Sequence, residues 1–147
     1  MDFFTAMDIS ASGLEASRTR LNVAASNMAN ASTTQGADGG PYKRRDVVLS
    51  SRPADDVLSA HGTEAAAPGT FAVQVAKIVE DSSPPRMEYA PGNPNANKDG
   101  YVAYPNVNVV EEMVDMITAS RAYQAGVTTL NAAVSLAERA LNIGKGS

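Results

Sequence analysis

The sequence predicts an α+β protein, mainly α, in which long N- and C-terminal helices pair as an antiparallel coiled coil, with a small β-rich insert between them. At both ends of the chain, apolar residues recur at alternating spacings of three and four, which keeps them on one side of a helix. Between the ends, the apolar period changes to two over short stretches that proline and glycine interrupt, as in strands and turns. The predicted coiled-coil domain therefore comprises residues 1–34 and 105–147, and the insert comprises residues 35–104.

The longest predicted element is the C-terminal helix, which begins after Pro105 and ends near Gly144. Asn108 is the expected N-cap, and Glu111 follows three residues later in a capping-box relation. The apolar side of this helix, the C-terminal seam, consists of Val109, Met113, Met116, Ser120, Tyr123, Val127, Leu130, Val134, Ala137 and Leu141. The helix is much longer than the average of about 11–12 residues, so its seam needs a partner. Gly126 costs this helix about 1 kcal/mol relative to alanine, and close packing is one reason to tolerate it.

The partner is expected at the N-terminus, where residues 3–30 are predicted to form a helix. Its N-terminal seam consists of Phe4, Met7, Ala11, Leu14, Arg18, Leu21, Ala25 and Met28. Small residues in both seams allow the helices to approach closely, but each buries little apolar area. We therefore expect the isolated chain to be largely disordered or loosely helical, with ends that become ordered on assembly.

The insert is predicted to contain short extended segments separated by loops. The extended segments are residues 42–50, 71–80, 86–89 and 100–105. The alternation in the second segment is expected to place Phe71, Val73, Val75 and Val79 on one half-buried face. The loops are residues 52–69, which are small and polar and are expected to be flexible, and residues 90–99, which are rich in turn-forming residues.

Composition disfavours several classes of function. The formal net charge of −4 argues against nucleic-acid binding, which uses a basic face. The absence of cysteine excludes disulfides and thiolate chemistry. No stretch approaches the roughly 20 apolar residues of a membrane span, and the first residues lack the pattern of a Sec signal, so any export is expected to follow another route.

Candidate metal ligands in the sequence are weak. His61 is the only histidine, and it lies in a predicted loop without a second His or Cys nearby. Residues 95–100 imitate the opening of a calcium loop, but Asn106 stands where that loop requires a bidentate glutamate. A series of Asx turns is the better interpretation of this segment, and no metal or cofactor is expected.

Two charged clusters have alternative interpretations. Glu111, Glu112 and Asp115 form a carboxylate cluster, and acids in the first turns of a helix also complement its dipole, which is the interpretation we prefer. The basic residues 43–45 are expected either to grip an acidic neighbour or a phosphate, or to form a solvated strand edge. Neither cluster has the convergent polar groups of a catalytic site.

Several motifs together resemble the bacterial flagellar rod and hook family, and within it the proximal rod proteins. The first is NMANAST at residues 27–33, which closes the N-terminal helix. The others are YAPGNPNAN at residues 89–97, GYV at 100–102, PNVN at 105–108 and ASRAYQA at 119–125. The residues that carry the resemblance most clearly are Asn27, Ala29, Asn30, Thr33, Gly100, Tyr101, Val102, Pro105, Asn106 and Asn108. The chain departs from the family where Asn93, Asn95 and Asn97 replace the usual His, Asp and Asp, and where Gly126 replaces a usual Asn.

The resemblance implies a structural subunit of the flagellar basal body and not an enzyme. It implies terminal helices that line the inner layer of the hollow rod, export through the flagellar type III apparatus, and a final place in the rod within the periplasmic space. The implied partners are the other proximal and distal rod proteins, the basal-body adaptor, the export apparatus and further copies of the chain, all serving motility. Asn27 and Asn30 are expected to fix the exit from the first helix by side-chain-to-backbone bonds. The expected assembly interface consists of Phe4, Met7, Leu14, Leu21, Met28, Met113, Met116, Tyr123, Leu130, Val134 and Leu141.

A second hypothesis belongs to a different class of protein. The chain would be a soluble binding or export-adaptor module that uses its terminal amphipathic helices for recognition. This alternative predicts a discrete complex, whereas a rod subunit is incorporated into a continuous assembly.

Overall fold

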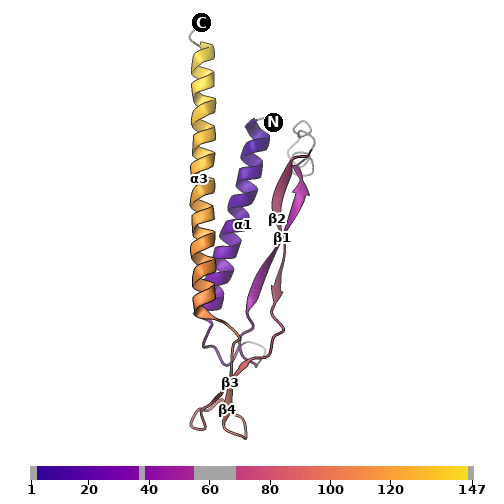
Figure 1. Ribbon diagram of the computed structural model, residues 1–147, viewed down its shortest axis with the longest axis vertical. Helices are drawn as coiled ribbons and strands as arrows, with labels where there is room; N and C mark the ends of the chain where they lie inside the picture. Colours follow the sequence, from indigo (N-terminus) through magenta and orange to yellow (C-terminus); the bar gives the residue numbers. More distant parts are fainter. Residues whose placement is uncertain (1–2, 37–38, 55–68, 146–147) are drawn as a thin grey trace. The chain divides into compact units, whose positions relative to one another are not determined.

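The computed structural model describes residues 3–36, 39–54 and 69–145, and Figure 1 shows the order of its elements. The elements are α1 (Phe3–Ala29), β1 (Arg45–Pro53), β2 (Phe71–Glu80), β3 (Arg86–Tyr89), β4 (Tyr101–Tyr104) and α3 (Val109–Lys145). The helices α1 and α3 have 27 and 37 residues, whereas the strands form two small two-stranded sheets, β1–β2 and β3–β4. The predicted α+β class, mainly α, is thus confirmed.

The chain divides into two compact units, and the division cuts through the four longest elements. Unit 1 consists of Met1–Thr19, Leu49–Ala76 and Ala119–Ser147, and unit 2 consists of Arg20–Val48 and Lys77–Thr118. Each unit therefore contains part of α1, part of the β1–β2 hairpin and part of α3, and unit 2 also contains β3 and β4.

Alanines dominate the packing of unit 1. Its buried apolar side chains, among the residues described, are Ala16, Ala54, Ala72 and Ala119. Leu14 of α1 packs so closely on α3 that a Cβ atom at Gly126 would lie 2.8 Å from its Cδ2 atom. The backbone N–H of Val73 in β2 donates to the Ser12 hydroxyl of α1 over 3.3 Å. Small side chains thus allow close approach between the segments of this unit.

Unit 2 buries polar groups as well as apolar ones. Ala24, Val102 and Pro105 are its buried apolar side chains in the described part of the chain, and Asn27 and Glu112 are also buried. Because a buried polar group needs hydrogen-bond partners, the side chains of Asn27 and Glu112 are expected to form specific hydrogen bonds.

The predicted boundaries of both helices agree with the structure to within one residue. Asn108 caps α3, since its Oδ1 atom accepts from the Val110 N–H over 3.1 Å, while Glu111 is exposed. At the end of α1, Asn30 donates from Nδ2 to the Ser26 carbonyl over 2.9 Å and accepts from the Thr33 hydroxyl over 3.1 Å. The side chain of Asn30 therefore bonds the last turn of the helix, as expected from the sequence.

The β1–β2 hairpin differs from the prediction at both its start and its faces. Strand β1 begins at Arg45 and not at Tyr42, because the Tyr42 N–H donates to the Thr33 carbonyl over 3.0 Å in the connection that precedes the strand. The strand also continues to Pro53, into the predicted loop 52–69, whose residues 55–68 lie outside the described part of the chain.

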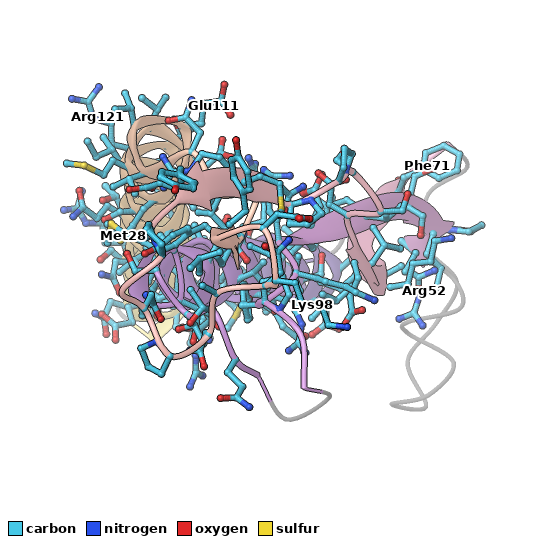
Figure 2. The ribbon with its side chains drawn as sticks, turned by 90° about the horizontal axis from the view of Figure 1, so that it is seen from below. Met28, Arg52, Phe71, Lys98, Glu111 and Arg121 are labelled. Atoms are coloured by element: carbon cyan, nitrogen blue, oxygen red, sulfur yellow. The ribbon has the colours of Figure 1, made fainter. Side chains whose placement is uncertain are left out.

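The predicted half-buried face of the second strand is wrong at its start. Phe71 is 57 % exposed and stands away from the hairpin in Figure 2, whereas Ala72, on the other face, is 2 % exposed. Val73 is also exposed, and only Val75 and Val79 are partly covered. The face that packs is the one that allows close approach, so the small Ala72 is buried in place of the large Phe71.

The β3–β4 hairpin is antiparallel, with cross-strand pairs from Arg86–Tyr104 to Tyr89–Tyr101. The rings of Tyr89 and Tyr101 meet edge to face, with centroids 5.3 Å apart. Gly100 has a φ of 82°, and a Cβ atom there would lie 2.9 Å from the Tyr89 ring, so both backbone conformation and space require glycine.

The loop between β3 and β4 is held by Asx turns, which confirms the interpretation of residues 95–100. The Asn93 side chain accepts from the Asn95 N–H over 2.9 Å. The Asn97 side chain accepts from the N–H groups of Asp99 and Tyr101, both over 2.9 Å. These asparagine oxygens thus bond the local backbone.

Candidate assembly site

The structure gives no support to a metal or membrane-spanning site in the residues that it describes. Within them, no three His, Cys, Asp or Glu side chains gather closely enough to hold a metal ion. No helix in the same part of the chain combines the length and apolar character needed to cross a bilayer. His61 lies outside the described residues.

A polar cluster in unit 2 joins three elements that are distant in sequence. We define the polar cluster as Asn27 at the end of α1, Tyr42 and Arg44 before β1, and Glu112 in the first turns of α3. Arg44 Nε donates to Glu112 Oε1 over 2.6 Å, and Asn27 Nδ2 donates to Glu112 Oε2 over 2.9 Å. Both carboxylate oxygens of Glu112, a residue only 1 % exposed, are therefore satisfied.

The side-chain amide of Asn27 uses its full hydrogen-bonding capacity. Its Oδ1 atom accepts from the Arg45 N–H and from the Tyr42 hydroxyl, both over 2.9 Å. Its Nδ2 group donates to the Arg45 carbonyl over 2.8 Å and to Glu112. An amide has two donors and two acceptor sites, so this residue fits the site in one orientation. The prediction that Asn27 fixes the exit from the helix needs correction, because its backbone partner is the start of β1.

Electrostatics favour the ionised form of Arg44. Burial lowers the pKa of Arg44, but the hydrogen bond and the charge of Glu112 outweigh burial and raise that pKa above its usual range. Asp46 and Asp115 each place a carboxylate oxygen 4.0 Å from the same guanidinium group. The cluster therefore contains a charge-assisted pair whose arginine remains protonated at any physiological pH.

Sequence reasoning proposed the role of Arg44 only as an alternative and assigned Glu112 to the helix dipole. The basic stretch 43–45 does grip an acidic neighbour, through its middle residue. In the sequence, Glu112 falls just outside the C-terminal seam, so its burial was not expected. The sequence offered one signal for this burial. If the packed side of the helix is shifted by one residue, Glu112 and Ala119, which are both buried, take the places of Met113 and Ser120.

The structure places the predicted interface residues unevenly. The partly covered ones are Met7, Leu14, Leu21, Met28, Met116, Leu130 and Val134. The predicted interface residues that are exposed are Met113, Tyr123 and Leu141, all on α3. The side chain of Phe4 is outside the described part of the structure. The covered members contribute to packing within their units, and the exposed members leave apolar surface for a partner.

Most residues of the family motifs are buried or partly buried. Asn27, Val102 and Pro105 are buried; Asn30, Thr33, Gly100 and Asn106 are partly buried; Ala29, Tyr101 and Asn108 are exposed. Several of them bond the backbone, at a helix end for Asn30 and Asn108 and at the start of β1 for Asn27. The motifs therefore specify the local fold more than a reactive site.

Two exposed apolar stripes occur on α3, one near each end. The head stripe in unit 2 consists of Val110, Met113, Val114 and Ile117. The tail stripe in unit 1 consists of Leu136, Arg139, Ala140 and Ile143. Each stripe follows the spacing i, i+3, i+4, i+7 and so lies along one side of the helix. Sequence reasoning included only Met113 of these eight residues, because it sought a single seam.

Comparisons with known proteins identify the family of the chain. The family described as "Flagella basal body rod protein" matches residues 7–37, and the family described as "Flagellar basal body rod FlgEFG protein C-terminal" matches residues 98–143. Proteins named flagellar basal-body rod protein FlgC from Yersinia enterocolitica, Salmonella typhimurium strain LT2 and Bacillus subtilis strain 168 are 44 %, 42 % and 38 % identical to the chain. Each alignment covers 99 % of this chain and 100 % of the relative. Asn27 and Glu112 of the polar cluster lie in the two matched segments.

Proposed function

Because the chain belongs to the family of flagellar basal-body rod proteins of the FlgC type, it is a structural subunit and not an enzyme, and we propose that it builds the proximal part of the hollow rod through its terminal helices. Family membership places it in the basal body of the bacterial flagellum, together with other rod components. Its contribution to motility is therefore mechanical, and its functional residues are those that pack and pair.

We propose that α1 and α3 form an antiparallel coiled coil made from residues 1–34 and 105–147, with residues 35–104 as the insert. In unit 1, Leu14, just before the midpoint of α1, packs against Gly126 of α3. In unit 2, Asn27, late in α1, bonds Glu112 near the start of α3. The reversed order of these contacts along the two helices supports antiparallel pairing.

The composition of the core is the single observation that carries the proposal of assembly. The described side chains that are both apolar and buried are Ala16, Ala24, Ala54, Ala72, Ala119, Val102 and Pro105. Such a core removes little apolar area from water, while many large apolar side chains of α3 and the hairpins stay exposed. Burial that the single chain lacks is supplied when neighbouring subunits cover these surfaces.

We also propose the route and the partners that membership in this family implies. The chain is exported through the flagellar type III apparatus and takes its place in the rod within the periplasmic space. Its neighbours are other proximal and distal rod proteins, the basal-body adaptor and further copies of the chain. In isolation the chain is loosely helical, and its ends become ordered on assembly. Hydrogen exchange on the dilute protein tests the last point, and strongly protected terminal helices in a confirmed monomer would contradict it.

Substitution of Leu130 tests the role of the helices in assembly. We expect Leu130→Asp to abolish incorporation into basal bodies, because it places an unpaired charge in the C-terminal seam. Asn131→Asp is the matched control, since Asn131 is the next residue of the same helix and is exposed. Each variant is expressed in a strain that lacks its own copy of this rod protein, and swimming and purified basal bodies are compared. Normal swimming with Leu130→Asp would overturn the assignment of the seam.

A further inference from the structure

We propose that the tail stripe of one copy of the chain docks on the head stripe of a second copy, with Arg139 entering an acidic groove beside the head stripe. The proposal rests on the proposed function and names the surfaces through which copies of the subunit meet. Figure 2 shows Glu111, which lines this groove, projecting outward from the start of α3.

The head stripe forms one wall of a groove in unit 2. The groove encloses about 310 Å³ and is lined by Arg44, Val110, Glu111, Val114 and Asp115. Its apolar residues, Val110 and Val114, are 68 % and 58 % exposed, so the wall is open to a partner. An apolar stripe beside a groove of this kind suits a helix that carries both aliphatic and charged groups.

The groove has a negative balance of charge. Glu111 is exposed and the side chain of Asp115 is 48 % exposed, whereas the guanidinium of Arg44 is already engaged by Glu112. Two carboxylates and one arginine line the groove, and the buried Glu112 already balances the charge of that arginine. The occupant therefore needs a positive charge in addition to apolar surface.

The tail stripe meets both requirements. Arg139 is exposed and is flanked at i−3, i+1 and i+4 by Leu136, Ala140 and Ile143. Leu136 and Ile143 are 67 % and 78 % exposed, and Ala140 leaves room for a larger side chain opposite. The exposed arginine Arg121, on the same helix, lacks such neighbours, since Thr118, Ala122 and Ala125 stand at these positions. A head on one copy and a tail on the next make a heterologous contact, which can repeat from copy to copy.

Cross-linking between two single-cysteine variants tests the contact. The chain has no native cysteine, so Val114→Cys in the head stripe and Ala140→Cys in the tail stripe report only on their own positions. We expect the mixed proteins to form a disulfide-linked heterodimer under mild oxidation. Glu138→Cys is the control, since Glu138 is exposed and is not three or four positions from any member of the tail stripe; it is expected to cross-link with Val114→Cys at least tenfold less. Equal yields, or no heterodimer, would overturn the proposal.

Reversal of charge provides a second measurement. Arg139→Glu is expected to lower the cross-linking yield about tenfold, because it places a carboxylate in the acidic groove, and Glu111→Arg in the partner is expected to restore the yield. Arg121→Glu is the matched control and is expected to leave the yield unchanged. Failure of the charge swap to restore the yield would overturn the role of Arg139.

A swimming assay separates this inference from the proposed function. The unmodified chain and the cysteine variants are expressed in the strain that lacks its own copy of the rod protein. Rescue of swimming without specific cross-linking would overturn the head-to-tail contact and leave the rod function intact. Absence of rescue by the unmodified chain would overturn the rod function itself.

Discussion

Leu14 of α1 occupies the space that a side chain on Gly126 of α3 would need. A Cβ atom on Gly126 would lie 2.8 Å from Leu14 Cδ2 and 3.3 Å from Leu14 Cγ. Glycine inside a helix costs about 1 kcal/mol relative to alanine, and here it allows a leucine to pack directly against the helix backbone.

The effect of Gly126→Ala should depend on Leu14. In the native background, the gain in helix propensity is offset because Leu14 must move, so we expect no stabilisation. In a Leu14→Ala background the space is free, and Gly126→Ala should stabilise by about 1 kcal/mol. Urea unfolding in trimethylamine N-oxide, which favours the folded state, measures both differences. The same gain in both backgrounds would show that the two residues do not interact.

Neutralisation of Glu112 should destabilise unit 2. Glu112→Gln removes the charge-assisted bond with Arg44, whose Nε lies 2.6 Å from the carboxylate. Hydrogen bonds to charged groups contribute roughly 1.5–3 kcal/mol, so we expect a loss of about 2 kcal/mol in the same unfolding assay. Glu111→Gln, one residue earlier and exposed, should change stability by less than about 0.5 kcal/mol. Equal effects of the two substitutions would argue against the buried pair.

Asp81 should titrate at unusually low pH. Hydrogen bonds from the side chain and then the backbone N–H of Ser83 lower the pKa of Asp81 below its usual range. Since the folded-state pKa is lowered, the stabilisation is present above the pKa of the unfolded chain and is lost as pH falls through the folded value. Carbon-detected NMR titration measures this pKa. Ser83→Ala should raise it, and Ser82→Ala should leave it unchanged; a pKa that Ser83→Ala does not move would contradict the assignment.

The elements were predictable because they depend on local patterns. The spacing of apolar residues changed from three and four in the helices to two in the insert. Asn108 marked the start of α3, and the asparagines between β3 and β4 indicated Asx turns. Each of these signals acts over a few residues. Local physics therefore defined nearly every boundary outside β1.

The polar cluster was not predictable in the same way. Arg44 and Glu112 are 68 residues apart in the chain, and Asn27 and Glu112 are 85 apart. A carboxylate near a helix N-terminus is ordinarily solvated, and only the tertiary fold reveals that an arginine covers this one. The sequence also left open which side of α3 packs against the rest of the unit, because the apolar residues at 113 and 116 fit two rotations of the helix. The structure shows Glu112 and Ala119 buried, so the first part of α3 has the rotation that the seam did not predict.

Replacement of Asn27 by aspartate should be the most damaging isosteric change in unit 2. The amide Nδ2 donates to the Arg45 carbonyl and to Glu112 Oε2, over 2.8 and 2.9 Å. Asn27→Asp would turn this donor into an acceptor facing a carbonyl and a carboxylate, in a residue that is 1 % exposed. A buried charge without a partner costs about 3–5 kcal/mol, and we expect a loss in this range in the urea assay.

Two further variants separate the hydrogen-bond pattern from the change in charge. Asn30→Asp alters the other asparagine of the motif, whose Nδ2 group bonds only the partly buried Ser26 carbonyl among the contacts described, and should cost less than about half as much. Glu112→Gln combined with Asn27→Asp supplies a new amide donor opposite the new carboxylate. The loss of stability in the double variant should therefore be smaller than the sum of the two single losses, by at least about 1 kcal/mol. Strict additivity would mean that Asn27 and Glu112 do not interact directly.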